Sequence, residues 1–295
     1  MITAATELPY QLLDVFTDVP LAGNPLAVFL QADALRADLM QRIARELNLS
    51  ETVFVLPSER ADCIARLRIF TPGTEMRFAG HPTIGAAFAL RSAGHAGAQD
   101  GAFAVEEQVG LVPIRIDDGE SPLVWLSTPR ISHVQEVDRV CAAHAAGLED
   151  YDLLPGLPCE VLSAGNPTLY VPVRDKDAVD RAWPDAAHRS QMQLTDDLVC
   201  IMIFTPTPDG AYSRVFGHSG IAEDPATGSA TGPLAAYMMR YGLAPASDGT
   251  SFVSEQGVRM GRRSLLHVRI RGEYGSESID VGGHVRAVGR GIMTL

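Results

Sequence analysis

The chain has 295 residues, with 24 basic and 36 acidic side chains and a formal net charge of −12. Hydrophobic residues make up 46% of the sequence and charged residues 20%, which excludes disordered, collagen-like and coiled-coil chains. Neither half of the chain has a basic surplus, so we expect no nucleic-acid partner. The sequence has no apolar run of 18 residues and no signal-peptide pattern, so we expect a cytoplasmic protein that does not bind membranes.

The first half of the chain begins with short strands and an amphipathic helix. Residues that recur every four positions, Leu35, Leu39, Ile43 and Leu47, predict a helix that Asn48 ends in a left-handed conformation. Short β-rich segments bounded by Pro, Gly, Asn or Asp predict strands. These segments are 12–16, 25–30, 52–56 and 65–70.

A second helix is predicted after His81, with Pro82 at its first position and small residues through Gly94. Its face between Ile84 and Leu90 is small and uncharged, which predicts a helix buried inside a curved sheet.

The second half follows the same plan. Predicted strands cover 160–165, 168–173, 198–204 and 211–216, and a helix follows that ends at Gly242. Pro233 would break a helix that began at Pro225, so we expect the helix to start between Ser229 and Thr231. The tail from residue 265 is strand-like, with Gly282–Gly283 as a turn and a possible return to the first half.

Two short motifs occur twice at nearly the same spacing. They are AGNP at 22–25 and 164–167, and HPTIGAA at 81–87 against DPATGSA at 224–230. The offsets are 142 and 143 residues, close to half the chain length. They predict duplicated halves related by a pseudo-twofold axis, with domains at residues 1–130 and 131–295.

Each half brings a helix start with unpaired backbone N–H groups to an equivalent place, and such ends bind carboxylates or phosphates. A small anionic metabolite is therefore the expected ligand of a cleft between the halves. The second motif aligns His81 with Asp224, an imidazole and a carboxylate suited to proton transfer. The alternative is that each residue caps its helix.

Glu51 precedes the apolar strand 52–56, where burial at a sheet end would make its carboxylate a stronger base; the alternative is a solvated loop residue. The four cysteines, Cys63, Cys141, Cys159 and Cys200, are widely spaced and predict reduced, mostly buried thiols. We expect no structural metal and no cofactor, since no metal-ligand spacing, GxGxxG after a strand or phosphate-binding loop occurs.

Five motifs together resemble the PhzF family of phenazine-biosynthesis isomerase-like proteins. They are DVFTDVPLAGNPLAV (14–28), NLSET (48–52), IFTP (69–72), FAGHPTIG (78–85) and EDPATGSA (223–230). The resemblance covers nearly the whole chain. It implies an α+β fold of the diaminopimelate-epimerase type, with two pseudo-symmetric domains that each wrap a curved sheet or barrel around a central helix.

The resemblance also implies a homodimer and an isomerase that moves a proton without cofactor or metal. Glu51 matches the family's catalytic glutamate, and His81 and Asp224 match its other acid/base or hydrogen-bonding residues. Gly80 and Ser229 match substrate contacts.

The expected function is thus a cofactor-independent, PhzF-like isomerase acting on a small carboxylate-bearing metabolite. Related epimerases use paired thiols at the starts of the two helices, where this sequence has Ala79 and Pro225, so we do not expect a two-thiol racemase. Two alternatives stay open: a non-catalytic binding protein on the same scaffold, and a lyase or epimerase that uses the same base.

Overall fold

The computed structural model describes residues 7–184, 198, 200–217, 223–272 and 278–295. The chain divides into two compact units, one of residues 1–127 with 282–295 and one of residues 128–281. Val199, in the predicted strand 198–204, lies outside the described residues. Within the described ranges, no helix is long and apolar enough to cross a membrane.

The first unit is a mixed sheet with two helices, α1 and α2, and a short 3₁₀ helix. Its strands are β1 (Glu7–Val15), β2 (Asn24–Phe29), β3 (Glu51–Leu56), β4 (Ala65–Phe70), β5 (Glu75–Met76), β6 (Ala102–Glu107), β7 (Gly110–Asp117), β8 (Leu123–Ser127) and the second part of β17 (Ser278–Thr294). Its helices are α1 (Ala37–Leu47), α2 (Gly80–Ser92) and η1 (Ala96–Ala98). The β2–β3 and β4–β6 pairs are parallel, and β1–β2, β3–β4, β4–β5, β6–β7, β7–β8 and β1–β17 are antiparallel.

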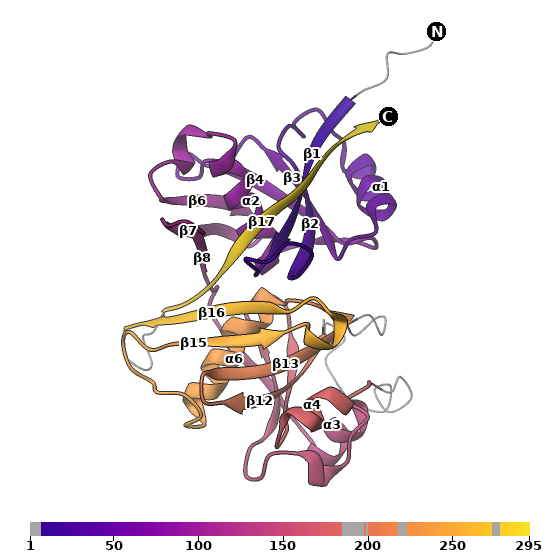
Figure 1. The fold of residues 1–295 in the computed structure, drawn as a ribbon, viewed down its shortest axis with the longest axis vertical. Helices are drawn as coiled ribbons and strands as arrows, with labels where there is room; N and C mark the ends of the chain where they lie inside the picture. The colour runs from indigo at the N-terminus through magenta and orange to yellow at the C-terminus, as the bar shows by residue number, and fades with distance from the viewer. Residues whose placement is uncertain (1–6, 185–197, 199, 218–222, 273–277) are drawn as a thin grey trace. The chain divides into compact units, whose positions relative to one another are not determined.

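Helix α2 runs through the middle of this unit and contacts β1, β2, β3, β4 and β8 (Figure 1). Small residues make this burial possible on all sides, because a side chain at Gly85 would place its Cβ 2.4 Å from Leu26 Cδ2. The helix begins at Gly80, so Pro82 is its third residue and not its first. Proline is tolerated there because the first four N–H groups of a helix have no intrahelical partner.

Helix α1 forms as its spacing predicts. Met40, Ile43 and Ala44 are buried against the aromatic residues Phe29 and Phe54 of the sheet. Asn48 ends the helix with φ 51° and ψ 35°, and its N–H bonds the carbonyl of Ala44. The predicted left-handed cap is confirmed.

The second unit has the same order of elements and adds β9 and α3 before them. Its strands are β9 (Ser132–Val137), β10 (Cys159–Ser163), β11 (Thr168–Pro172), β12 (Cys200–Thr207), β13 (Gly210–Gly217), β14 (Glu223–Asp224), β15 (Ser251–Gln256), β16 (Ser264–Arg271) and the start of β17. Its helices are α3 (Arg139–Ala145), η2 (Asp150–Asp152), α4 (Lys176–Arg181), α6 (Gly228–Arg240) and η3 (Val258–Met260).

The strand pairing of the second unit repeats that of the first. The β11–β12 and β13–β15 pairs are parallel, as β2–β3 and β4–β6 are. The β10–β11, β12–β13, β13–β14 and β15–β16 pairs are antiparallel, as their counterparts are. Helix α6 takes the place of α2 in the order of elements. The predicted fold, two similar α+β units each with a central helix, is therefore present.

Helix α6 starts at Gly228, one residue before the predicted start between Ser229 and Thr231, and contains Pro233 in its interior. The proline removes the hydrogen bond to the carbonyl of Ser229, yet the helix continues to Arg240. Nearly every residue of α6 is buried, so packing around Tyr237 and its neighbours offsets the lost bond.

The predicted turn at Gly282–Gly283 is wrong, because both residues lie inside the continuous strand β17. The chain passes from the second unit to the first at this point. The glycines are needed for close approach and not for a turn. An added Cβ would lie 2.5 Å from the Trp125 ring at Gly282 and 2.3 Å from the Phe16 ring at Gly283.

Candidate functional site

Glu51 is the first residue of β3 and follows the cap of α1 by three positions. Parallel pairing of β2 and β3 places it opposite Leu26, near the start of both strands. The side chain is 16% exposed, so the carboxylate is mostly desolvated but accessible. A mostly buried carboxylate that still reaches the surface is suited to accept a proton from a bound molecule.

His81 is the second residue of α2 and lies against Glu51. Its side chain is buried, and its Nε2 atom lies 3.3 Å from Oε2 of Glu51. On the other side of the ring, Nδ1 lies 3.3 Å from Nδ2 of Asn24, which begins β2. Two parallel strands and the start of the central helix thus bring Asn24, Glu51 and His81 together.

The protonation state of His81 follows from its burial. Burial lowers the pKa of His81 from 6.5 to about 3, because an imidazolium ion loses its hydration there. A neutral ring has one N–H. The Asn24 amide nitrogen can only donate, so Nδ1 accepts and the ring hydrogen is on Nε2, the atom that lies 3.3 Å from Oε2 of Glu51. A neutral imidazole at this distance weakens a neighbouring carboxylate as a base less than an imidazolium ion would.

Gly80 opens α2, directly before His81, and is buried. The N–H groups of this first turn have no partner within the helix, and the helix dipole is positive there. The region around Glu51 therefore combines a carboxylate with groups that attract an anion.

In the second unit, Asp224 ends the two-residue strand β14 and Ser229 is the second residue of α6. Oδ2 of Asp224 accepts a hydrogen bond of 2.5 Å from the hydroxyl of Thr227. The backbone carbonyl of Asp224 accepts a bond of 2.7 Å from the Gln256 amide. Both bonds fasten Asp224 to the turn that leads into α6.

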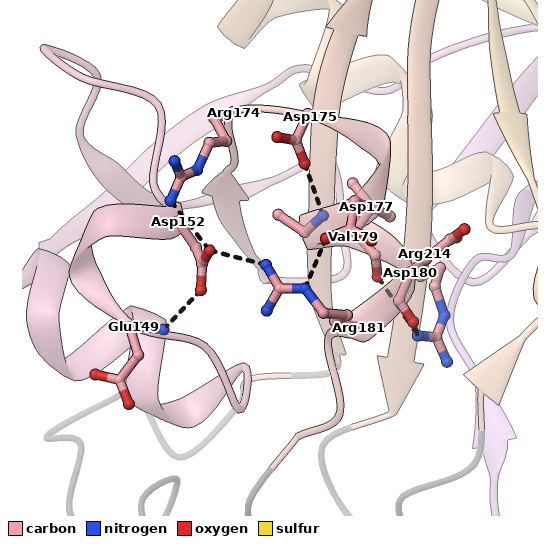
Figure 2. Close-up of polar contacts among 10 residues, drawn as sticks. Glu149, Asp152, Arg174, Asp175, Asp177, Val179, Asp180, Arg181 and Arg214 are labelled. Carbon is pink, nitrogen blue, oxygen red and sulfur yellow. Dashed lines mark hydrogen bonds and ion pairs between the residues drawn. The ribbon is translucent and has the colours of Figure 1, made fainter.

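Arg214 secures the strand that carries Asp224. Its guanidinium binds both oxygens of Glu223 at 2.9 Å and donates to the carbonyls of Asp180 at 2.9 Å and Ala182 at 2.7 Å. Figure 2 shows Arg214 beside α4. A charge-assisted pair in this buried position fixes β14 against β13.

The same figure shows how α4 itself is held. Asp152, 1% exposed, accepts hydrogen bonds from Arg181 at 2.9 Å, Arg174 at 3.3 Å and the N–H of Glu149 at 3.1 Å (Figure 2). Burial alone raises the pKa of Asp152, but these bonds and the two arginine charges outweigh it and lower the pKa overall. The ionised Asp152 therefore joins η2 to α4.

The predicted equivalence of His81 and Asp224 is wrong. Arg68 binds Glu75 in the first unit as Arg214 binds Glu223 in the second, so Glu75 and Glu223 are equivalent. Asp224 then corresponds to Met76, and Ser229 corresponds to His81, since each is the second residue of its helix. The offset from His81 to Ser229 is 148 residues, whereas the motif alignment of His81 with Asp224 has an offset of 143. The motif alignment is therefore a chance resemblance that lies five positions before the structural match.

Sequence reasoning missed three side chains around these helix starts. Asn24 was part of a recognised repeat but had no assigned role, although it contacts His81. Glu107 and Gln256 end the strands β6 and β15, and both are buried. The sequence pattern that could have found Glu107 and Gln256 is a polar residue two positions after an apolar or small residue, which places it on the inward face of a strand.

The cysteines are outside this site. All four are free, and Cys63, Cys159 and Cys200 are buried while Cys141 is exposed. A surface hollow of about 770 Å³ in the first unit is lined by Cys63 and Arg60 among others, and contains none of the predicted site residues.

The comparisons with known proteins agree with the resemblance of the motifs. The family model for PhzC-PhzF, described as phenazine biosynthesis-like protein, matches residues 13–291. The chain is 37% identical to an uncharacterized isomerase, mll1393, of Mesorhizobium japonicum, over 96% of this chain and 97% of the relative. It is 35% identical to a trans-2,3-dihydro-3-hydroxyanthranilate isomerase of Pseudomonas chlororaphis, over 97% of this chain and 99% of the relative.

A solved structure from Bacillus anthracis, a phenazine biosynthesis protein of the PhzF family, has a TM-score of 0.88 and 30% identity, and covers 98% of this chain and 100% of that one. This likeness confirms the predicted fold class. The chain therefore belongs to the PhzC-PhzF family of phenazine biosynthesis-like isomerases.

Proposed function

We propose that the protein is a cofactor-independent isomerase that moves a proton on a small metabolite carrying a carboxylate, with Glu51 as the general base. The contact of 3.3 Å between the Glu51 carboxylate and the neutral, buried His81 is the main support. A mostly desolvated carboxylate beside a neutral imidazole is an effective proton acceptor. The named relatives include a trans-2,3-dihydro-3-hydroxyanthranilate isomerase.

In the proposed reaction, the substrate carboxylate binds at the start of α2, near the N–H groups of Gly80 and His81. Glu51 removes a proton from an activated carbon of the substrate and returns it to another carbon, so the composition of the substrate does not change. The positive end of the helix dipole stabilises negative charge as it develops. His81 stays neutral beside the carboxylate of Glu51 throughout.

For the second unit we assign Asp224 as a further acid/base or hydrogen-bonding group and Ser229 as a substrate contact. The bonds that fasten Asp224 to Thr227 and Gln256 support a defined orientation for its carboxylate. As the family resemblance implies, the proposal also includes a homodimer. The charge and the hydropathy pattern of the sequence support a cytoplasmic location and no nucleic-acid partner.

The substitution Glu51→Gln tests the role of the base. The purified protein is incubated in heavy water with trans-2,3-dihydro-3-hydroxyanthranilate, and isomerisation and deuterium uptake are followed by NMR. We expect Glu51→Gln to lower kcat by about 10²- to 10⁴-fold, because the amide cannot accept the proton.

Glu46→Gln is the matched control, since Glu46 is exposed on α1. Near-normal exchange in Glu51→Gln would remove Glu51 from the role of base. Binding of the probe, seen as a thermal shift, without deuterium uptake in the unaltered protein would favour a binding protein. Loss of water from the product would favour a lyase.

A further inference from the structure

A second buried carboxyl group lies on the far side of the α2 start. Glu107 is the last residue of β6 and is 5% exposed. Its Oε1 atom lies 2.5 Å from the hydroxyl of Thr83, in the first turns of α2. The N–H of Ala79, the residue before α2, also contacts this carboxyl group. Glu107 therefore touches the backbone and the side chain of the turn that carries His81.

The hydrogens at Thr83 identify the donor in this contact. The Thr83 hydroxyl has one hydrogen and lies within reach of two acceptors, Glu107 Oε1 at 2.5 Å and the carbonyl of Ala79 at 2.7 Å. A carbonyl cannot donate, so both contacts are hydrogen bonds only when Thr83 donates to Ala79 and accepts from Glu107. The short bond to Glu107 is then complete only if Glu107 has the hydrogen, as a neutral carboxylic acid.

The second unit has an always-neutral side chain at the equivalent place, which bonds Thr227, the counterpart of Ala79, and not Thr231, the counterpart of Thr83. Thr231 donates to the carbonyl of Thr227 at 3.0 Å, as Thr83 does to that of Ala79. Gln256, the last residue of β15, accepts from the N–H of Thr227 at 3.2 Å and donates to its hydroxyl at 3.1 Å. The glutamine occupies the position of Glu107 at the end of the equivalent strand. A protonated glutamate has the same combination of one donor and one acceptor side.

The surroundings of Glu107 agree with a neutral acid. Burial raises the pKa of Glu107 from 4.5 to about 8, although the bonds with Thr83 and Ala79 oppose this. The titratable and charged groups of the neighbouring elements have contacts elsewhere or are exposed. Arg66 contacts Glu59, Arg68 contacts Glu75, Glu106 contacts Ser58, Arg91 contacts Asp118, Asp117 contacts Trp125, His81 contacts Glu51, and Arg115 is exposed.

We propose that Glu107 is a positioning residue that, as a neutral hydrogen-bond donor, fixes the first turn of α2 and so holds His81 against Glu51. The proposal rests on the proposed function of Glu51 and adds a residue that does not touch the substrate. The line of contacts runs from Glu107 through Thr83 and Ala79 to the helix start, and from His81 to Glu51.

Three variants test this assignment. Glu107→Ala removes both contacts, Thr83→Val removes the hydroxyl at nearly constant volume, and Glu107→Gln keeps a donor and an acceptor. We expect the first two to lower kcat at least about tenfold with KM changed less than about twofold, because a displaced catalytic group mainly affects the reaction step. We expect Glu107→Gln to recover kcat to within about threefold of the unaltered protein.

Two readouts do not depend on turnover. The ¹⁵N NMR signals of the His81 ring should show a neutral Nε2–H form in the unaltered protein and in Glu107→Gln, and should shift in Thr83→Val. The Tm of the unaltered protein should fall by about 5 °C or more relative to Glu107→Gln as the pH rises from 5 to 8, because only the native glutamate must stay protonated in the fold.

Gln256→Ala is the matched control, since it breaks the equivalent contacts in the second unit and should leave the His81 signals unchanged. The proposal would be overturned if Glu107→Gln lowered kcat as much as Glu107→Ala and if the Tm difference between the unaltered protein and Glu107→Gln did not vary with pH. If Glu51→Gln stays active while the His81 signals respond as expected, the function of Glu51 fails and the positioning by Glu107 stands. If Glu107→Ala does not fold, Thr83→Val and Glu107→Gln still decide the outcome.

Discussion

Two buried side chains in the first unit, His81 and Glu107, are held in their neutral forms by the loss of hydration. Burial lowers the pKa of His81 to about 3 and raises that of Glu107 to about 8. The unfolded chain would protonate the histidine below pH 6.5 and ionise the glutamate above pH 4.5. Between pH 4.5 and 6.5, the free energy of unfolding changes with pH in opposite directions for the two groups, and the changes cancel. Only His81 acts below this range, and only Glu107 acts above it.

His81 therefore determines part of the acid sensitivity of the fold. As the pH falls below 6.5, the unfolded state gains a proton that the native ring does not take up until about pH 3. The free energy of unfolding of the native protein should then fall relative to that of His81→Gln, by at most about 1.4 kcal/mol per pH unit. Urea unfolding at a series of pH values measures it.

The same substitution at His144, whose side chain is 39% exposed, controls for the loss of a histidine. Curves for the native protein and His81→Gln that run parallel between pH 6.5 and 3 would contradict a neutral His81. A rise of the native curve as the pH falls would give the wrong sign and would also contradict it.

At the scale of secondary structure, close packing determines where glycine is required. Strand β17 runs unbroken through Gly282 and Gly283 because aromatic rings of the first unit fill the space where side chains would be. In α2, Gly85 has the same role against Leu26. The local sequence shows only that glycine is present, and the neighbouring ring or side chain decides whether it marks a turn or a contact.

Gly283→Ala should destabilise the protein by about 1–3 kcal/mol, because the new Cβ would lie 2.3 Å from the Phe16 ring and 3.0 Å from its Cα. Gly289→Ala in the same strand is the control, since its Cβ would lie 3.5 Å from Leu12 at ordinary contact distance. It should change the free energy of unfolding by less than about 1 kcal/mol. Thermal or urea unfolding measures both, and equal effects would refute the packing argument.

At the scale of the whole molecule, two units with the same order of strand pairs each enclose a central helix. The chain joins them twice, at residues 127–128 and again within β17 at residues 281–282. The second crossing gives the first unit a strand that pairs with β1 along its length, from Glu7 with Thr294 to Val15 with Val285. The first unit therefore depends on the last residues of the chain.

A chain that ends at Val281 should lose the first unit before the second. Removing the partner of β1 exposes the edge of this strand, and β1 in turn packs against α2. Hydrogen exchange followed by mass spectrometry should show lost protection in β1 and α2, and retained protection in α6. The control ends at Thr294 and removes only Leu295, beyond the strand. Equal protection of α2 in both chains would contradict this dependence.

Local pattern predicted much of the fold. The helix marked by apolar residues every four positions, its Asn48 cap and the β-rich strands each depend on interactions within a few residues, and all appear in the structure. The recurrence of short motifs and the resemblance to the PhzF family follow from the order of residues alone. Glu51, His81, Asp224, Gly80 and Ser229 were chosen as site residues on the same grounds, and their roles stay predictions.

Contacts between distant segments were decided only by the tertiary structure. It brings both Asn24 and Glu51 to 3.3 Å from the ring of His81. It also makes His81 and Ser229 equivalent positions, which the alignment of motifs missed. Glu107 is 24 residues from Thr83, and only the parallel pairing of β4 and β6 carries it to the helix start. The reason is that hydration, hydrogen-bond partners and protonation depend on what surrounds a side chain in space, which neighbours along the chain do not specify.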